Sequence, residues 1–407
     1  MAFEIIETKN IKSNLLSYES NVPAITKYMG SKRAILDFVI KALDDNYTGG
    51  VVCDLFGGTC ILSGALGKIV PMHSNDIQEY SAVMARTYLS DYNWDLYSDE
   101  ILNEISNKAS DYVQFVKKKN KGLDFQYGEK MTIKDFVSLE DEQQRLINYN
   151  FKVSHYLFIK YYSGTYWSYE QCLWIDALRK IADDYGGTPL KNVIISSLMY
   201  AMSYNSQSTG HYAQYREATD LASKSDILIY RQKEILPYFI NKFKQLYASL
   251  GANKLRHTIT TMDYAECLDQ LSPNTLVYAD PPYAFVHYSR FYHALETLVK
   301  YDYPEVDHKG RYRNDRHQSP FCKATEVKAA FSTLFSKIKN KKSNLVLSYS
   351  NTGMITLDEI LEIAKTSLNS NYRISIEEVA YKHSTMGRRK DKSKSVSEYL
   401  VIANRSQ

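Results

Sequence analysis

Residues 276–283 read Leu-Val-Tyr-Ala-Asp-Pro-Pro-Tyr, a short apolar run that stops at an acid, two prolines and an aromatic residue. The apolar part suits a buried strand of a parallel sheet. Pro281 and Pro282 cannot donate to a strand ladder, and each restricts the residue before it, so the chain leaves the sheet in a defined turn. Such a turn can aim the Asp280 carboxylate, the carbonyl between the prolines and the Tyr283 ring at one planar target. An exocyclic amine of a nucleobase is a target of this shape.

Six further segments have the apolar character of strands, and the chain between them is largely helical in pattern. They are residues 51–55, 69–73, 257–261, 344–349, 373–380 and 398–403. The first four, together with 275–279, indicate a parallel sheet, whereas the last two read as a closing pair separated by a basic loop. We therefore expect an α/β fold with a doubly wound, mostly parallel sheet of seven strands.

An aspartate follows four of these strands, namely Asp54, Asp76, Asp263 and Asp280. Ligands of doubly wound sheets bind beyond the carboxyl ends of the strands, so we expect these four carboxylates around one site. Aspartate also commonly caps the helix that follows a strand. That alternative accounts readily for one or two of the four, and less readily for all of them.

The composition limits the class of protein. A chain of 407 residues is long enough for two domains, or for one α/β domain with a large insertion. The 50 basic and 46 acidic residues give a net charge of +4, which permits a nucleic-acid partner without requiring one. The five cysteines include no Cys-x-x-Cys pair, so we expect neither a zinc site nor a disulfide framework. Without a signal-peptide pattern or an apolar run of about 18 residues, we expect a soluble, cytoplasmic protein.

Residues 51–67, VVCDLFGGTCILSGALG, read as a strand, an acid and a glycine turn that leads into a helix. The segment has neither the Gly-x-Gly-x-x-Gly pattern of a dinucleotide site nor the Gly-Lys-Ser/Thr of a P-loop. Asp54 can instead take an ammonium group, Phe56 can lie near an adenine or sulfonium, and Gly57 and Gly58 allow a ligand to approach the backbone. This pattern favours a zwitterionic ligand.

Two neighbouring segments add to this predicted ligand site. Asp76 and Ile77 follow the next strand, where a carboxylate typically binds ribose hydroxyls. Residues 27–33, KYMGSKR, precede a predicted helix, and Ser31 is a candidate cap for it. Lysine at a helix N-terminus is unfavourable to the helix dipole, which favours a ligand-contact role for Lys32.

Taken in order, segments 27–32, 54–58, 75–77, 263–264 and 280–283 resemble the Dam-like, α-class DNA adenine-N6 methyltransferases. The resemblance runs from about residue 24 to 90 and from 200 to 403, with a looser match between. It implies S-adenosylmethionine as the cofactor and double-stranded DNA as the partner. The cofactor residues it implies are Tyr28, Ser31, Lys32, Asp54, Phe56, Gly57, Gly58, Asp76, Ile77, Asp263 and Tyr264. The catalytic loop it implies is Asp280, Pro281, Pro282 and Tyr283.

The resemblance also implies a domain order and an activity. A mainly helical target-recognition domain, residues 91–250, is expected to interrupt a methyltransferase domain made of residues 1–90 and 251–407. The expected activity is site-specific methylation of the N6 atom of a flipped adenine, in a restriction-modification, phage or epigenetic setting. A cognate restriction endonuclease is a possible functional partner, and no stable protein partner is implied.

Three segments supply candidates for DNA contact. Residues 204–216, YNSQSTGHYAQYR, read as a glycine-centred loop or hairpin and include Tyr204, Asn205, Tyr212, Tyr215 and Arg216. The basic segments 310–323 and 388–394 add Arg311, Arg313, Arg316, Lys323, Arg388 and Arg389. Basic loops of this kind neutralise phosphates, although a solvated loop is the alternative for each.

Cys60 departs from the resemblance, because the family's turn commonly reads Phe-x-Gly-x-Gly and the last glycine is here a cysteine. A side chain at this position crowds the ligand or requires a positive φ from cysteine, which is disfavoured. We expect a slightly displaced turn, with weaker cofactor affinity as the risk.

Other functions remain open on the sequence. Cytosine-N4 methyltransferases more often begin the catalytic loop with serine, and glutamine or RNA-base methyltransferases more typically have Asn-Pro-Pro-Tyr. A catalytically silent DNA-binding protein with the same fold is a further alternative, favoured only by Cys60. A nicotinamide oxidoreductase lacks its glycine fingerprint here.

Overall fold

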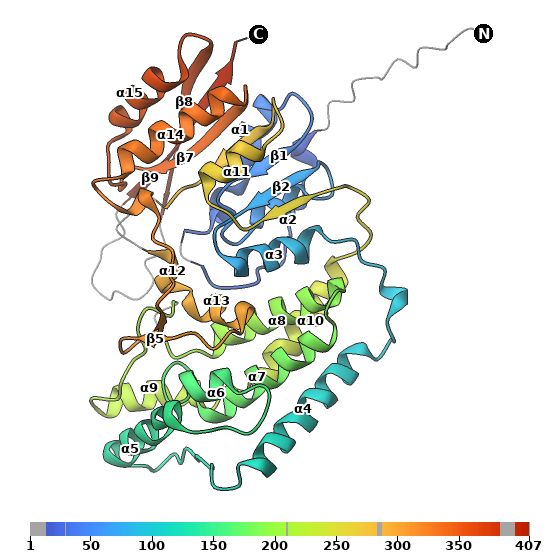
Figure 1. Cartoon of the computed structure of the whole chain (residues 1–407), viewed down its shortest axis with the longest axis vertical. Helices are drawn as coiled ribbons and strands as arrows, with labels where there is room; N and C mark the ends of the chain where they lie inside the picture. Colours follow the sequence, from blue (N-terminus) through green and yellow to red (C-terminus); the bar gives the residue numbers. More distant parts are fainter. Residues whose placement is uncertain (1–13, 29, 209–210, 283–286, 383–394, 407) are drawn as a thin grey trace, which may run out of the picture.

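The computed structural model describes residues 14–28, 30–208, 211–282, 287–382 and 395–406. Its centre is a seven-stranded sheet with the strand order β3-β2-β1-β4-β7-β9-β8 (Figure 1). The strands are β1 (Val52–Asp54), β2 (Met72–Asn75), β3 (Thr258–Thr260), β4 (Leu276–Ala279), β7 (Asn344–Ser350), β8 (Tyr372–Lys382) and β9 (Ser395–Arg405). The first five run parallel, and β9 lies antiparallel between β7 and β8. The predicted α/β fold with a mostly parallel seven-stranded sheet is therefore confirmed.

Helices cover both faces of this sheet. Successive side chains along a strand point to opposite faces, so each strand contributes to two hydrophobic cores. Val52 and Tyr278 belong to one core, which also takes in residues of α1 (Leu36–Asn46), α2 (Ile61–Leu66) and α3 (Glu79–Leu89). Cys53 and Val277 belong to the other core, with α11 (Tyr264–Gln270), α14 (Val327–Asn340) and α15 (Leu357–Leu368). The sheet is thus the middle of three layers, and its strand ends are left open for a ligand.

A helical part follows α3 and lies below the sheet in Figure 1. Its helices are α4 (Ile101–Lys119), α5 (Ile133–Gln144), α6 (Leu157–Tyr162), α7 (Tyr169–Asp184), α8 (Pro189–Asn205), α9 (Leu221–Arg231) and α10 (Ile235–Ser249). Local sequence sets several starts: Ser168 and Gln171 form a capping box at α7, and Pro189 opens α8. Buried residues such as Phe158, Trp167 and Leu198 share one continuous core with the adjacent face of the sheet.

The chain returns to the helical part after β4. There it forms α12 (Tyr288–Phe291), α13 (His293–Lys300) and a small hairpin of β5 (Val306–Asp307) and β6 (Tyr312–Arg313). Arg179 of α7 donates from Nε to the Leu298 carbonyl at 2.8 Å, which ties this segment to the helices. Short 3-10 turns complete the fold: η1 (Leu15–Ser17), η2 (Lys32–Ile35), η3 (Trp94–Leu96), η4 (Arg145–Asn148) and η5 (Pro320–Cys322).

Among the described residues, no helix is both long enough and apolar enough to span a lipid bilayer.

Candidate active site

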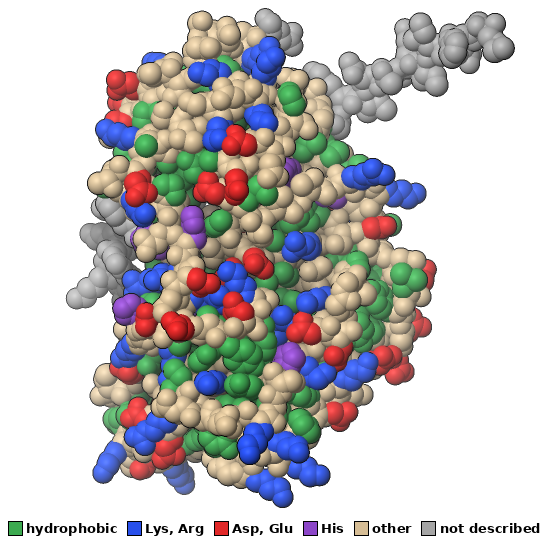
Figure 2. All heavy atoms as spheres, viewed as in Figure 1, with side chains coloured by type: hydrophobic (Ala, Val, Ile, Leu, Met, Phe, Trp, Pro, Cys, Tyr) green, Lys and Arg blue, Asp and Glu red, His purple; other side chains and the backbone are tan. Residues whose placement is uncertain are grey.

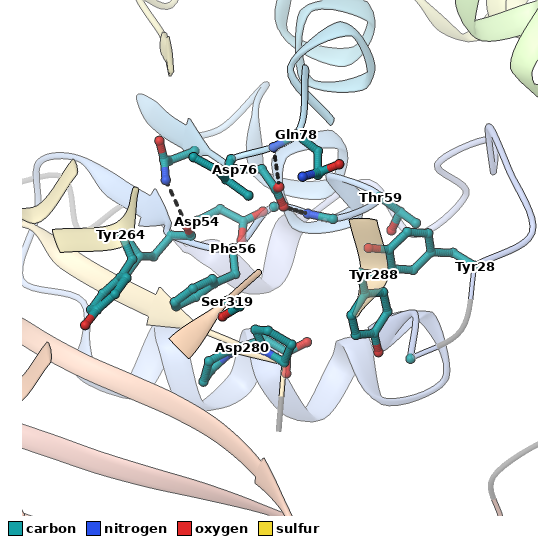
Figure 3. A pocket seen from close by; sticks show the side chains of 18 of the residues that line it. Tyr28, Asp54, Phe56, Thr59, Asp76, Gln78, Tyr264, Asp280, Tyr288 and Ser319 are labelled. Atoms are coloured by element: carbon teal, nitrogen blue, oxygen red, sulfur yellow. Dashed lines mark hydrogen bonds between the residues drawn. The ribbon is translucent and has the colours of Figure 1, made fainter. Parts of the chain in front are cut away.

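A cleft opens at the carboxyl ends of β1, β2 and β4, between the sheet and α12 (Figure 3). It encloses about 1190 Å³, its open mouth included. The predicted residues that line it are Tyr28, Ser31, Lys32, Asp54, Phe56, Gly57, Gly58, Asp76, Ile77, Asp263, Tyr264, Asp280, Pro281 and Pro282. The fold therefore gathers these residues in one place, while Tyr283 lies outside the described residues.

Asp54, the last residue of β1, puts a buried carboxylate at the back of the cleft. Within the described part of the chain, no lysine or arginine forms an ion pair with it. Burial raises the pKa of Asp54 to about 8, and the charges of Asp280 and Asp76 contribute. A buried carboxylate without a cation is costly, so this position suits the ammonium group of a bound ligand.

The glycine turn after β1 is fixed by the aspartate that follows β2. Asp76 accepts a hydrogen bond from the Gly58 amide through Oδ2 and one from the Gln78 amide through Oδ1, both at 2.9 Å (Figure 3). Gly58 has a φ of 52°, and a Cβ at this position would lie 3.5 Å from the Tyr28 ring. The backbone can thus approach a ligand closely, and Asp76 keeps lone pairs for hydroxyl donors.

Aromatic rings form one wall of the cleft. The Phe56 ring stacks on the Tyr264 ring, with centroids 5.9 Å apart, and meets the Phe321 ring edge-on at 5.5 Å. Asp263 caps α11 by accepting a hydrogen bond from the Ala265 amide at 2.9 Å, which holds its carboxylate at the cleft. A flat apolar surface beside a fixed acceptor is suited to an aromatic base with an amino group.

The opposite wall is a stack of tyrosines. Tyr28 lies 4.3 Å from Tyr292 and 5.5 Å from Tyr288, measured between ring centroids. Gly30, with a φ of 78°, lies against this stack, because a Cβ there would meet the Tyr288 hydroxyl at 2.9 Å. The glycine is therefore needed for the close approach of the segment around Ser31 to the cleft.

Lys32 lies between two carboxylates at the catalytic loop. Its Nζ is 3.0 Å from Oδ1 of Asp280 and 2.8 Å from Oε1 of Glu398, and both Lys32 and Glu398 are buried. Burial raises the pKa of Asp280 to about 6; the positive charge of Lys32 opposes this rise, and the negative charge of Glu398 adds to it. Asp280 is therefore ionised at neutral pH and becomes protonated in mildly acidic solution.

Several residues of this site are not indicated by the sequence patterns. Glu398 of β9 is one, and its signal is an acid directly before the apolar run at residues 399–403. Others that line the cleft are Tyr278, His287, Tyr288, Ser289, His317, Ser319 and Cys322. Most of these come from the segment that returns past the helical part, whose path a strand-by-strand reading does not reveal.

Cys60 takes the positive φ that its place in the turn demands, with φ 54° and ψ 31°. Its Sγ is buried and donates to the Ser81 carbonyl at 3.2 Å, and Cys60 is not among the residues that line the cleft. The side chain therefore packs under the turn at the expense of left-handed backbone strain.

Four of the eleven predicted DNA-contact residues lie inside the protein. Asn205, Tyr212, Tyr215 and Arg313 are buried. Tyr212 and Tyr215 pack around the Tyr166 ring, and Arg313 pairs with Asp302 and Asp315. Because buried side chains offer no surface to DNA, the prediction of DNA contact is not retained for these four.

The remaining candidates for DNA contact differ in their hydrogen-bond and ion-pair partners. The Arg311 guanidinium donates to the backbone carbonyls of Tyr161 and Gln144, so it joins segments of the protein and is not retained either. Arg216 pairs with Asp226, and Lys323 pairs with Glu326 at 3.2 Å. Arg388 and Arg389 lie outside the described residues.

Tyr204 belongs to a lysine–tyrosine patch made of Lys27, Tyr200, Tyr204, Lys233 and Lys242. Lys27 Nζ lies 4.0 Å from the centre of the Tyr204 ring, and Lys242 Nζ lies 4.1 Å from that of Tyr200. The two rings are 4.3 Å apart, and Lys233 donates to the Tyr204 carbonyl at 3.1 Å. Lys242 is buried, whereas the other four members of the patch are half-buried. Amines interleaved with rings, as in these four, are typical of surfaces that bind nucleic acid.

Comparison with known proteins agrees with this arrangement. The family model of the D12 class N6 adenine-specific DNA methyltransferases matches residues 28–170 and 192–363. The chain is 25% identical to type II methyltransferase M.FokI of Planomicrobium okeanokoites over 364 residues, which cover 86% of this chain and 48% of that protein. It is 23% identical to modification methylase StsI of Streptococcus sanguinis over 388 residues, which cover 92% and 50%.

A shorter match, 34% over 90 residues, is to modification methylase LlaI of Lactococcus lactis subsp. lactis, and it covers 22% of this chain and 14% of that protein. The chain spans about half the length of M.FokI and StsI. The family model, by contrast, matches well over half of the chain. This chain therefore belongs to the D12 class N6 adenine-specific DNA methyltransferase family.

Proposed function

We propose that this chain transfers a methyl group from S-adenosylmethionine to the N6 atom of an adenine flipped out of double-stranded DNA. The observation that carries the proposal is the convergence of Asp54, Asp76 and Asp280 on one cleft, at the ends of neighbouring parallel strands. Family membership supports it, and so do the relatives, which are named as methylases.

The cofactor residues fit S-adenosylmethionine by their chemistry. Asp54 would accept its ammonium group, the Asp76 carboxylate its ribose hydroxyls, and Asp263 with Phe56 its adenine. When bound, S-adenosylmethionine supplies a methyl group that is activated by the positive sulfonium. The residue types of this cleft therefore match each part of the cofactor.

Asp280 and the Pro281 carbonyl would receive the target amine. The N6 atom of adenine is a poor nucleophile because its lone pair is delocalised into the ring. Two acceptors that bind its two N–H groups draw the nitrogen toward tetrahedral geometry and free the lone pair. The base must first leave the duplex, at a cost of a few kcal/mol, and stacking on Tyr283 would offset part of this cost.

The rest of the molecule would hold DNA. The lysine–tyrosine patch defined above supports a role for Tyr204 in contact with DNA. Tyr204 lies in α8, within the helical part proposed as the target-recognition domain, residues 91–250. Figure 2 shows Lys and Arg side chains mixed with Asp and Glu on one face, so binding would depend on local clusters and not on overall charge. Action within a restriction-modification system, alongside a cognate endonuclease in the cytoplasm, belongs to the same proposal.

Expression in a host that lacks adenine methylation tests the proposal. N6-methyladenine is expected in digested DNA by mass spectrometry, at one sequence motif that methylation-sensitive sequencing would identify. Cells that express Asp280→Ala should lack it. N4-methylcytosine in place of N6-methyladenine, or no modified base at all, would contradict the proposed reaction.

Cys60→Val is expected to weaken cofactor affinity by about tenfold and to lower the melting temperature. A β-branched residue is strongly disfavoured at the positive φ of this turn, and the larger side chain would push on Gly57, whose added Cβ would already lie 3.1 Å from Cys60 Sγ. Calorimetric titration with S-adenosylmethionine measures the effect. Cys172→Val, at a buried helical position in α7, is the matched control and should leave the affinity unchanged.

A further inference from the structure

Two arginines are held against the ring of Tyr312. The guanidinium carbons of Arg290 and Arg316 each lie 5.2 Å from the ring centre. Arg290 donates from Nε to the Tyr312 hydroxyl at 3.2 Å, and Arg316 donates from Nε to the Arg313 carbonyl at 3.1 Å. The shared ring and these hydrogen bonds fix both side chains in place and bring two positive charges close together.

Neither arginine is neutralised by a carboxylate among the described residues. The basic side chains beside them are paired: Arg313 with Asp302 and Asp315, and Lys309 with Glu217. The charges of Arg316 and Arg290 also contribute, after burial, to lowering the pKa of the nearby His287. Two fixed like charges without a partner repel each other, so an anion bound between them would stabilise this arrangement.

These arginines line a surface pocket in which every charged side chain is basic. Its residues are Gln214, Arg290, His308, Lys309, Gly310, Tyr312 and Arg316. Gly310 permits the close packing, because a Cβ there would lie 2.4 Å from the Tyr312 ring. Planar guanidinium groups match the geometry of phosphate oxygens, so the pocket suits a phosphate group.

The basic pocket shares a wall with the active-site cleft. Ser289 and His317 line the cleft, while their chain neighbours Arg290 and Arg316 line the basic pocket. Ser289 Oγ donates to the His317 carbonyl at 2.6 Å and so joins the two segments that form the wall. In a nucleotide, only one sugar separates the base from its phosphate. The cleft and the basic pocket are likewise adjacent, so they suit the base and the phosphate of one nucleotide.

We propose that Arg290 and Arg316 bind the DNA phosphate next to the nucleotide whose adenine enters the cleft. This inference rests on the function proposed above and deepens it. The contact anchors the backbone at the flipped nucleotide, where anchoring helps to hold the extruded base, and it carries no sequence information. A free phosphate ion has the same chemistry as the phosphodiester group, so the test must separate these two ligands.

The test combines substitution of the two arginines with removal of the negative charge from single phosphates of the DNA. Duplexes that contain the methylated site would carry one uncharged methylphosphonate at each position around the target adenine. The unmodified protein should lose roughly 10- to 100-fold in kcat/KM at one position next to that adenine. Arg290→Gln/Arg316→Gln should lose a similar factor on the ordinary duplex, and no further factor at that position. Arg290→Gln alone serves as a second variant. The Arg290 side chain is exposed, so this change should not impair folding.

Several outcomes would overturn the inference. Equal losses in kcat/KM at every methylphosphonate position would exclude a specific contact. So would a double variant that loses the full additional factor when the methylphosphonate is also present. Tight binding of inorganic phosphate alone, without any methylphosphonate effect, assigns the pocket to a free ion. Arg256→Gln is the matched control, since this exposed arginine precedes β3 at the amino ends of the strands and should change neither quantity.

A second measurement keeps the inference separate from the proposed reaction. The salt dependence of duplex binding, followed by fluorescence anisotropy, requires no methyl transfer. The double variant should reduce the slope of log Kd against log salt by about one to two units. If the protein methylates no adenine, the proposed function fails whatever the slope; if it does and the slope is unchanged, only the phosphate contact fails.

Discussion

Asp280→Ala is expected to lower kcat for methyl transfer by at least about 10³-fold, with little change in the affinity for S-adenosylmethionine. The carboxylate is largely buried, lies at the end of β4 and is held by Lys32 at 3.0 Å. Alanine removes the acceptor for the target amine and leaves Asp54 and Asp76 in place. Single-turnover transfer of radiolabelled methyl groups and calorimetric titration with the cofactor measure the two quantities.

The control for this change is Asp99→Ala, at an exposed aspartate ahead of α4, which should leave both quantities unchanged. An Asp280→Ala protein that retained turnover within tenfold of the unmodified protein would remove Asp280 from the mechanism.

The pH dependence of kcat at saturating cofactor gives a second readout for Asp280. With a pKa raised to about 6, Asp280 loses its charge as the pH falls through 6, so kcat should fall with it. Glu398→Gln removes a neighbouring negative charge and should move this fall to lower pH.

Asp54→Asn is expected to weaken cofactor affinity by roughly 30- to 1,000-fold, because a buried ammonium would lose its charged partner. The same change should not lower stability. Aspartate normally releases its proton near pH 3.8, but folded Asp54 does so only near pH 8. Ionisation at this site therefore costs stability as the pH rises between these values, and asparagine avoids the cost. A melting temperature at pH 7.5 that is unchanged or raised, together with lost binding, separates the two effects.

The affinity for S-adenosylmethionine should also depend on pH through Asp54. Below about pH 8 the carboxyl of the free protein is protonated, and binding of an ammonium group must expel that proton. The affinity should therefore weaken as the pH falls below 8, and titrations in buffers of different ionisation enthalpy should reveal proton release. Asp54→Asn should abolish both effects. Proton release that persists in this variant would assign the titration to another group.

The sequence predicted the sheet well, because strands buried on both faces leave long apolar runs ended by polar turns. Seven segments read as strands, and all seven pair in one sheet. The rule that ligands bind beyond strand ends then brought Asp54, Asp76, Asp263 and Asp280 together without knowledge of their contacts. These features depend on local pattern and on topology, both of which a single sequence carries.

The sequence could not predict which of these polar and aromatic side chains are buried, or which partners they contact. Tyr212 and Tyr215 look like surface stacking residues in a polar loop, yet they pack around Tyr166 in the core. Arg313 looks like a phosphate ligand in a basic run, yet Asp302 and Asp315 neutralise it. Residue type states what a side chain can do, and only packing decides whether it faces solvent.

The pairing of Lys32 with Glu398 sets an order on synthesis and folding. The two residues are 366 positions apart, and Glu398 enters only when β9 inserts between β7 and β8. A growing chain on the ribosome therefore has Asp54, Asp76 and the catalytic Asp280 with its lysine long before Lys32 gains Glu398 as a second, buried partner. Contacts of such sequence separation form slowly. We expect methylation competence to arise as one late event, after most of the sheet has already assembled.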